Sequence, residues 1–273
     1  MPELPEVETV ANGVHTRVHG QSIVSVWLSR YKEPFKTSRA EMADALPGLR
    51  IERVRREGKH IVFDLKADMS AAQWVVHLGM TGRLLVTPAD LPRPKHTHAV
   101  LALSGGRELR FVDPRRFGRL AFYRRDKESG GFRGPGHEPL TISAEDFIDL
   151  FRGRQLSIKA ALLNQSLLHG VGNIYADESL FRAGIRPTHA AGRLSRTRLL
   201  RLHAAIQEIL QKAIALGGSS VSDYVDAEGQ AGFFQLEHRV YMRTDQPCLV
   251  CGKPIHRILL AGRGTHFCLH CQR

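Results

Sequence analysis

The 273-residue sequence predicts an α+β protein in three successive parts: a β-sandwich preceded by one helix, a helical domain and a four-cysteine zinc module. Three observations support this fold class. Short apolar runs separated by glycine and proline fill the first half, which is typical of antiparallel strands. Apolar residues then recur every three to four positions, as in amphipathic helices. All four cysteines lie in the last 26 residues.

A helix is predicted over residues 5–19, because Pro5 suits a first turn and Gly20 comes directly after the helical segment. Eight β-type runs come next, and this number and spacing favour an antiparallel sandwich or flattened barrel. They span residues 22–29, 49–56, 60–65, 73–78, 83–87, 99–103, 108–112 and 120–123.

Helical periodicity begins after a segment rich in glycine and proline, residues 126–139, which is typical of a hinge. Helices are predicted over 144–152, 157–168 and 196–216, and a further one begins at Asn173 or Ile174. We therefore expect a sandwich domain over 1–125, a linker over 126–139, a helical domain over 140–237 and a zinc module over 238–273.

Two short glycine-containing segments interrupt the helical domain. Gly170 and Gly172 leave backbone N–H groups uncovered beside a helix start, an arrangement that suits a phosphate oxygen, although such turns usually just join helices. The segment from Gly217 to Leu236 is too long for a simple linker, and loops of this kind are often functional lids.

The cysteine spacing predicts one structural zinc ion. Cys248 and Cys251 form one Cys-x-x-Cys pair, and Cys268 and Cys271 form a second after 16 residues. Two such pairs complete a tetrahedral four-thiolate shell with no open position, so the metal should stabilise the fold and do no chemistry. The alternative of two disulfides is disfavoured in a reducing cytoplasm.

Net charge indicates a polyanionic partner. Lysine and arginine number 39 against 27 aspartates and glutamates, a surplus of 12, which favours nucleic acid. A basic enzyme with no nucleic-acid role is the alternative on charge alone. No apolar run approaches the length of a membrane span, and Glu3, Glu6 and Glu8 argue against a signal peptide. We expect a cytoplasmic protein without membrane contact.

The first residues suggest a nucleophile. Removal of Met1, which a small following residue normally permits, would leave Pro2 as a free secondary amine. An α-amine has a pKa near 8, so a useful fraction is unprotonated at neutral pH. Such an amine can attack a sugar C1′ and form an iminium, with Glu3 moving a proton. An ordinary acidic helix cap is the alternative.

Five motifs in order along the chain resemble bacterial formamidopyrimidine-DNA glycosylase. They are residues 1–9, 77–80, 113–118 and 170–176 and the four-cysteine tail. The resemblance implies a β-sandwich, a helix-two-turn-helix domain and a zinc finger, with duplex DNA bound by a monomer. It implies a base-excision-repair enzyme that removes 8-oxoguanine and formamidopyrimidines. It also implies AP-lyase activity by β,δ-elimination through a Schiff base, with no organic cofactor.

The resemblance also implies roles for individual residues. Pro2 is the nucleophile, Glu3 the acid that opens the deoxyribose ring, and Glu6 supports the site. Lys59 corresponds to the lysine of β-elimination, and Arg263 to the arginine of δ-elimination. Met80, Arg115 and Phe117 fill the void left by the extruded nucleotide, and residues 217–234 form the lid over its base. The implied DNA contacts are His96, Arg115, Arg154, Lys159, Asn173 and Tyr241.

Three other functions compete with this interpretation. Endonuclease VIII, which acts on oxidised pyrimidines, shares the Pro-Glu start but lacks the motif at 113–118. A non-catalytic DNA-binding relative would not need Pro2, Glu3 and Lys59. A zinc-ribbon protein that binds RNA or ribosomes fits the positive charge but leaves the N-terminal motif unexplained.

Overall fold

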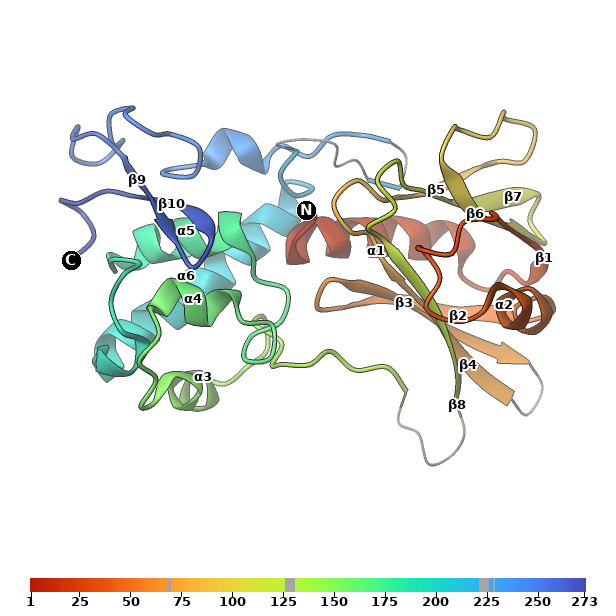
Figure 1. Ribbon diagram of the computed structural model, residues 1–273, viewed down its shortest axis with the longest axis horizontal. Coiled ribbons are helices and arrows are strands. Elements are labelled where there is room, and N and C mark those ends of the chain that lie inside the picture. Colours follow the sequence, from red (N-terminus) through yellow and green to blue (C-terminus); the bar gives the residue numbers. More distant parts are fainter. Residues whose placement is uncertain (68–69, 126–130, 221–225, 228) are drawn as a thin grey trace. The chain divides into compact units, whose positions relative to one another are not determined.

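The computed structural model describes residues 1–67, 70–125, 131–220, 226–227 and 229–273 (Figure 1). The chain forms two compact units. The first comprises Met1–Arg133 and Gly217–Phe233, and the second comprises Gly134–Leu216 and Phe234–Arg273. Within the described residues, no helix is both long and apolar enough to cross a membrane.

The first unit is a sandwich of two four-stranded antiparallel sheets, in the orders β1-β6-β7-β5 and β2-β3-β4-β8 (Figure 1). The eight strands are those the sequence predicts, with ends that differ by a few residues. They are β1 (Ile23–Leu28), β2 (Arg50–Glu57), β3 (His60–Ala67), β4 (Ser70–His77), β5 (Arg83–Pro88), β6 (Thr97–Leu103), β7 (Arg107–Val112) and β8 (Arg119–Arg125).

Helix α1 (Leu4–Val18) packs into the sandwich core. Val7, Val10, Val14 and Val18 recur at helical spacing, and all four are buried in one cluster with the inward residues of both sheets. Each buried valine contributes about 1.5–3 kcal/mol relative to exposure. This packing holds the N-terminus of the chain against the sandwich.

Helix α2 (Arg39–Ala45) was not among the predicted elements. Ser38 caps it by accepting a hydrogen bond from the Glu41 N–H, and Met42 is its buried residue. Seven residues with one buried side chain carry too little periodicity to be recognised in the sequence.

The second unit contains four α-helices, two short 3-10 helices (Ala191–Arg193 and Phe234–Glu237) and a β-hairpin among its described residues. Three helices follow a serine cap whose hydroxyl accepts a backbone N–H, and α5 lies between two glycine caps, Gly172 and Gly184, the second of which has a positive φ. The elements are α3 (Ala144–Phe151), α4 (Ile158–Leu163), α5 (Asn173–Ala183), α6 (Arg196–Ala215), β9 (His256–Leu260) and β10 (Arg263–Phe267).

Two predicted boundaries differ from the structure. Helix α4 ends at Leu163 instead of continuing to residue 168, because Asn164 leaves the helical conformation and its carbonyl accepts from Leu167 and Leu168 in a turn. Residues 217–233, expected in the helical domain, group with the first unit, since Ser219 donates to Glu6 and Val86 donates to the Ala227 carbonyl.

Candidate active site and metal centre

The N-terminal residues are buried at the start of α1. Pro2 and Glu3 are both buried, and Glu6 is only 2% exposed. Glu6 Oε2 accepts a hydrogen bond from the Glu3 N–H at 2.7 Å, and its Oε1 accepts one from the Ser219 N–H at 2.7 Å. One carboxylate therefore joins the start of the chain to the beginning of the predicted lid.

Glycines allow the close approach of the lid base to Glu6. A Cβ on Gly218 would lie 2.9 Å from Glu6 Oε1, and one on Gly232 would lie 2.3 Å from the Gly218 carbonyl oxygen. The two ends of the predicted lid thus meet at a neck beside Glu6. Residues 221–225 and 228 of that lid lie outside the described part of the chain.

Lys59 lies in the turn between β2 and β3 and is only 8% exposed, so most of its side chain is shielded from solvent. Burial, together with the charges of His60, Lys59 and Arg119, lowers the pKa of His77 to about 4. His77 Nδ1 accepts from the Gly79 N–H at 3.2 Å, which requires an unprotonated nitrogen there. Lys59 and Arg119 therefore lie close enough to His77 to oppose its protonation.

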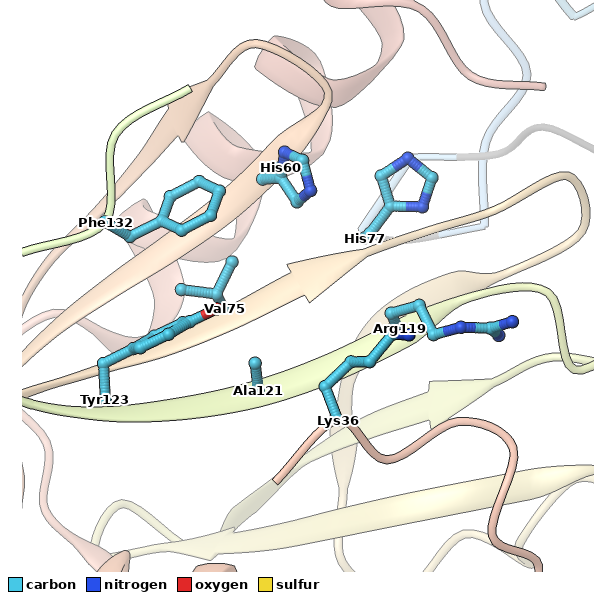
Figure 2. Close-up of a pocket in the computed structure, with 8 residues that line it drawn as sticks. All are labelled: Lys36, His60, Val75, His77, Arg119, Ala121, Tyr123 and Phe132. Atoms are coloured by element: carbon cyan, nitrogen blue, oxygen red, sulfur yellow. The ribbon is translucent and has the colours of Figure 1, made fainter. Parts of the chain in front are cut away.

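A pocket of about 410 Å³ opens on the outer face of the second sheet (Figure 2). One of its lining residues, His60, follows Lys59 directly in the sequence. Val75 and Ala121 lie at its centre, with Phe132 and His60 on one side and Lys36 and Arg119 on the other. Its lining residues are Lys36, His60, Val75, His77, Arg119, Ala121, Tyr123 and Phe132. None of these is acidic, so the pocket suits an anionic group.

Phe132 reaches this pocket from the predicted linker. Its N–H donates to Gln73 Oε1 at 2.6 Å, and its ring lies 4.8 Å from that of His60. Residues 126–130 of the predicted linker lie outside the described residues, but Gly131 and Phe132 are fixed against β4.

The predicted void-filling residues lie on two loops in backbone contact. A Cβ on Gly79 would be 2.5 Å from the Gly118 nitrogen, so Gly79 lets the loop of Met80 meet the loop of Arg115 and Phe117. Met80 is 40% exposed and Phe117 is 48% exposed, so neither belongs to the core.

Asp113 organises these loops, a role the sequence reasoning missed. Its fully buried carboxylate accepts from Thr81 Oγ1 at 2.6 Å and from the Gly118 N–H at 2.7 Å, while its own N–H donates to the carbonyl of His96. The first residue of the motif at 113–118 could have indicated this role, since an aspartate carboxylate often accepts hydrogen bonds from backbone N–H groups that follow it in the chain.

Arg115 stacks on its neighbour. The guanidinium carbon of Arg115 lies 4.7 Å from the centre of the Phe117 ring. A cation and an aromatic ring thus extend from one loop, as a wedge with hydrogen-bond donors requires.

Lys159 in the second unit does not offer its charge to solvent. Its side chain is 0% exposed, and Nζ pairs with Asp177 Oδ1 at 2.7 Å and donates to Thr265 Oγ1 at 2.8 Å. This ion pair and the hydrogen bonds of the buried ammonium argue against a direct contact between Lys159 and a DNA phosphate.

The other predicted site residues of this unit differ in exposure. Arg263 is exposed on β10, Tyr241 is half-buried, and Asn173 at the start of α5 donates to the Gly264 carbonyl at 3.0 Å. Arg154 donates through Nε to the Leu150 carbonyl and so caps the end of α3.

The four cysteines converge in the second unit. Their sulfur atoms all lie within 4.8 Å of one another, with 3.9 Å between Cys248 and Cys271 and 3.5 Å between Cys251 and Cys268. Tetrahedral zinc with Zn–S bonds of about 2.3 Å requires sulfurs about 3.8 Å apart. The donor set fits one structural Zn²⁺.

Comparison with known proteins covers both units. The family model of the formamidopyrimidine-DNA glycosylase N-terminal domain matches residues 1–120, and that of the H2TH domain matches residues 135–225. A zinc finger found in FPG and IleRS matches residues 245–273. The chain belongs to the formamidopyrimidine-DNA glycosylase family.

Individual relatives agree over the whole length. Formamidopyrimidine-DNA glycosylase of Solibacter usitatus is 45% identical, and the alignment covers all of both chains. A Lactococcus lactis FPG mutant, solved in complex with DNA containing Fapy-dG, is 36% identical, with a TM-score of 0.89 and full coverage of both chains. MutM (FPG) of Thermus thermophilus is 40% identical, with a TM-score of 0.85 and coverage of 99% and 98%.

These matches confirm the predicted fold class, since the chain contains a β-sandwich, an H2TH domain and a zinc finger. The zinc-finger match and the cluster of four cysteines confirm the predicted metal, one structural zinc ion. Besides Asp113, sequence reasoning missed Asp177 and Glu178, which lie beside the matched motif at 170–176. Their signal was two adjacent carboxylates on one helix of a basic protein, which by itself does not indicate burial.

Proposed function

We propose that this chain excises oxidised purines, 8-oxoguanine and formamidopyrimidines, from duplex DNA and then cleaves the strand as an AP lyase. The observation that carries the proposal is the N-terminus. Pro2 and Glu3 lie at the start of α1, and the Glu6 carboxylate accepts a hydrogen bond from the Glu3 N–H. The family relatives align with the whole length of the chain, this segment included.

The first step is an attack by Pro2. Removal of Met1, which is 49% exposed, converts the Pro2 nitrogen from an amide to a secondary amine. Its lone pair forms a bond to C1′, and the C1′–N9 bond breaks, so the base leaves with that electron pair and gains a proton. Glu3 gives a proton to O4′ as the sugar ring opens, and loss of the amine proton leaves an iminium between Pro2 and C1′.

Strand cleavage follows by two eliminations. Loss of a C2′ proton to a base breaks the C3′–O bond, and the 3′ phosphate leaves with the electron pair. Loss of a C4′ proton then breaks the C5′–O bond. Lys59 serves proton transfer in the first elimination, and Arg263 serves phosphate binding and the second.

Base excision requires that the nucleotide leave the helix, at a cost of a few kcal/mol. Met80 and Phe117 would occupy the space left in the stack, and Arg115 would hydrogen-bond the orphaned base. His96, Asn173, Tyr241 and Arg154 are proposed as further DNA contacts. Asp113 joins His96 to the loops of Met80 and Arg115 through its hydrogen bonds. These contacts support the assignment of His96, Met80 and Arg115 to one surface of the first unit.

Zinc holds the last module of the chain and takes no part in the reaction, because Cys248, Cys251, Cys268 and Cys271 leave no coordination position open. The proposed partner is damaged duplex DNA, bound by a monomer. We also propose that the protein acts in the bacterial cytoplasm.

Borohydride trapping tests the nucleophile and the substrate together. The protein is incubated with duplexes that contain 8-oxoguanine or thymine glycol, reduced with borohydride and mapped by peptide mass. We expect an adduct on Pro2 that forms faster with 8-oxoguanine. An adduct on Lys59 would overturn the assignment of Pro2, and faster trapping on thymine glycol would indicate an endonuclease VIII-like specificity.

A further inference from the structure

Two neighbouring carboxylates on α5, Asp177 and Glu178, are buried and lie outside the proposed catalytic steps. Asp177 is 1% exposed, as is Glu178. Burial raises the pKa of Glu178, although three backbone N–H groups oppose this by stabilising its charge. A buried carboxylate persists only where specific partners compensate its desolvation, so the partners indicate its role.

Asp177 bonds the strand that carries Arg263. Its Oδ2 accepts from the His266 N–H at 2.8 Å, and its Oδ1 pairs with Lys159 Nζ at 2.7 Å. Lys159 in turn donates to the Gly264 carbonyl at 3.1 Å and to Thr265 Oγ1 at 2.8 Å. The charge pair thus holds β10 from Gly264 to His266.

The backbone of Arg263 itself belongs to this network. Thr265 Oγ1 donates to the Arg263 carbonyl at 3.2 Å, while Asn173 Nδ2 donates to the next carbonyl, that of Gly264, at 3.0 Å. Arg263 therefore extends its exposed side chain from a strand whose backbone is held by the buried Lys159 of α4 and the half-buried Asn173 of α5.

Glu178 bonds the opposite end of the zinc module. It accepts the N–H groups of Arg239, Val240 and Tyr241 at 2.8–3.0 Å. Val240 packs in one apolar cluster with Cys248 and Cys268. Adjacent residues of one helix thus hold two segments that carry proposed phosphate contacts, Tyr241 and Arg263.

A separate contact holds the cysteine knuckle. The buried amide of Gln272 accepts from the Cys268 N–H at 2.9 Å and donates to the Ile185 carbonyl at 2.9 Å. Loss of the Asp177 network would leave this contact and the four thiolates in place. Its effect should therefore be confined to the hairpin of β9 and β10.

We propose that Asp177 is a positioning residue, which acts through Lys159 and the backbone of β10 to fix Arg263 for phosphate binding and the second elimination. The proposal rests on the proposed function of Arg263. Two parts of the zinc module then have different roles. Zinc maintains the cysteine knuckle, whereas the Asp177–Lys159 pair positions Arg263. This pairing also gives Lys159 a role different from direct DNA contact.

The variant Asp177→Asn tests this proposal. An amide keeps the shape but removes the charge that compensates Lys159, and its NH₂ group would face a donor, either Lys159 Nζ or the His266 N–H. The substrate is a duplex with a preformed abasic site, and the readout is the ratio of δ- to β-elimination product. Because both products come from the same folded molecules, partial unfolding does not change that ratio.

We expect the ratio to fall by up to about 100-fold, the effect of a misplacement near 1 Å. Zinc content should stay at one ion per chain. The dependence of DNA affinity on salt should weaken by about one unit of log–log slope, as for the loss of one phosphate contact. The matched control is Glu208→Gln on α6, which breaks an exposed ion pair to Arg182 of α5 and should change the ratio by less than about twofold.

Arg263→Ala is measured in parallel to separate the two hypotheses. If Arg263→Ala leaves the product ratio and the salt slope unchanged, the proposed function of Arg263 is wrong. If Arg263→Ala changes them but Asp177→Asn does not, the positioning role is wrong. Loss of zinc from Asp177→Asn would also contradict the proposal, because the network would then maintain the whole module.

A milder variant covers the case in which Asp177→Asn does not fold. Thr265→Val removes the hydroxyl that links Lys159 to the Arg263 carbonyl and leaves the Asp177–Lys159 pair intact. The same fall in δ-elimination relative to β-elimination is expected, to a smaller extent. A wild-type ratio in a folded, zinc-loaded Thr265→Val protein would overturn the proposal.

Discussion

Substitution of Glu6 by glutamine should separate the start of the chain from the base of the lid. The Glu6 carboxylate accepts from the N–H groups of Glu3 and Ser219, both at 2.7 Å, and is almost fully buried. Glutamine has one acceptor oxygen, so its NH₂ group must face one of these two N–H donors. One hydrogen bond is lost and the other loses its charge.

The magnitude follows from these two bonds. A hydrogen bond to a charged group is worth about 1.5–3 kcal/mol, and a buried donor left without an acceptor costs about 1–3 kcal/mol. The free energy of unfolding of the first unit should therefore fall by about 2–4 kcal/mol. If the lower figure appears in the transition state, excision slows by about 30-fold.

Two single-turnover assays locate the loss. The first measures excision of 8-oxoguanine, and the second measures borohydride trapping on a preformed abasic site, which needs no base recognition. We expect both rates to fall, because Glu6 holds the backbone of Glu3 beside Pro2.

The control is Glu52→Gln, an exposed carboxylate of β2 paired with Arg50, which should change neither rate. Wild-type rates for a folded Glu6→Gln protein would refute the positioning role. A fall in excision alone would assign Glu6 to the lid and not to the nucleophile.

Three further predictions follow from other parts of the structure. Cys268→Ser should abolish zinc and DNA binding while the sandwich still unfolds cooperatively in a thermal melt; full affinity after zinc removal would contradict this. Arg115→Ala should reduce the ratio of 8-oxoguanine excision rates opposite C and opposite A by roughly 5- to 150-fold, the effect of a lost polar contact of about 1–3 kcal/mol. Phe117→Ala should instead slow excision opposite both bases. Equal slowing of both substrates by Arg115→Ala would show that the arginine does not discriminate. Because the pKa of His77 is about 4 in the folded state and about 6.5 when unfolded, the unfolded state binds the proton first as the pH falls. The first unit should thus lose up to about 3 kcal/mol between pH 6.5 and 4 in denaturant titrations, and His77→Gln should remove most of this loss.

The contrast between Lys159 and Lys59 shows where sequence reasoning reached its limit. The family resemblance implies a role in DNA binding or catalysis for both lysines, yet the structure buries Lys159 in an ion pair with Asp177, 18 positions away in sequence. No local sequence pattern distinguishes Lys59 from Lys159. The partner of a charged side chain depends on how distant helices and strands pack against each other. The same holds for Glu6, whose partner Ser219 follows more than 200 residues later.

The sequence by itself determined the strands, the main helices, the zinc ligands and the family. These features depend on local periodicity, on capping residues and on spacings such as Cys-x-x-Cys, which persist in any conformation of the chain. Only the tertiary structure decided which polar groups are buried together: Asp113 with the loops of Met80 and Phe117, Asp177 with Lys159, and Glu178 with the segment of Tyr241. The reason is physical. A carboxylate has the same sequence signature in water and in a core, and only its desolvation, which the surrounding fold imposes, makes its hydrogen bonds strong and specific.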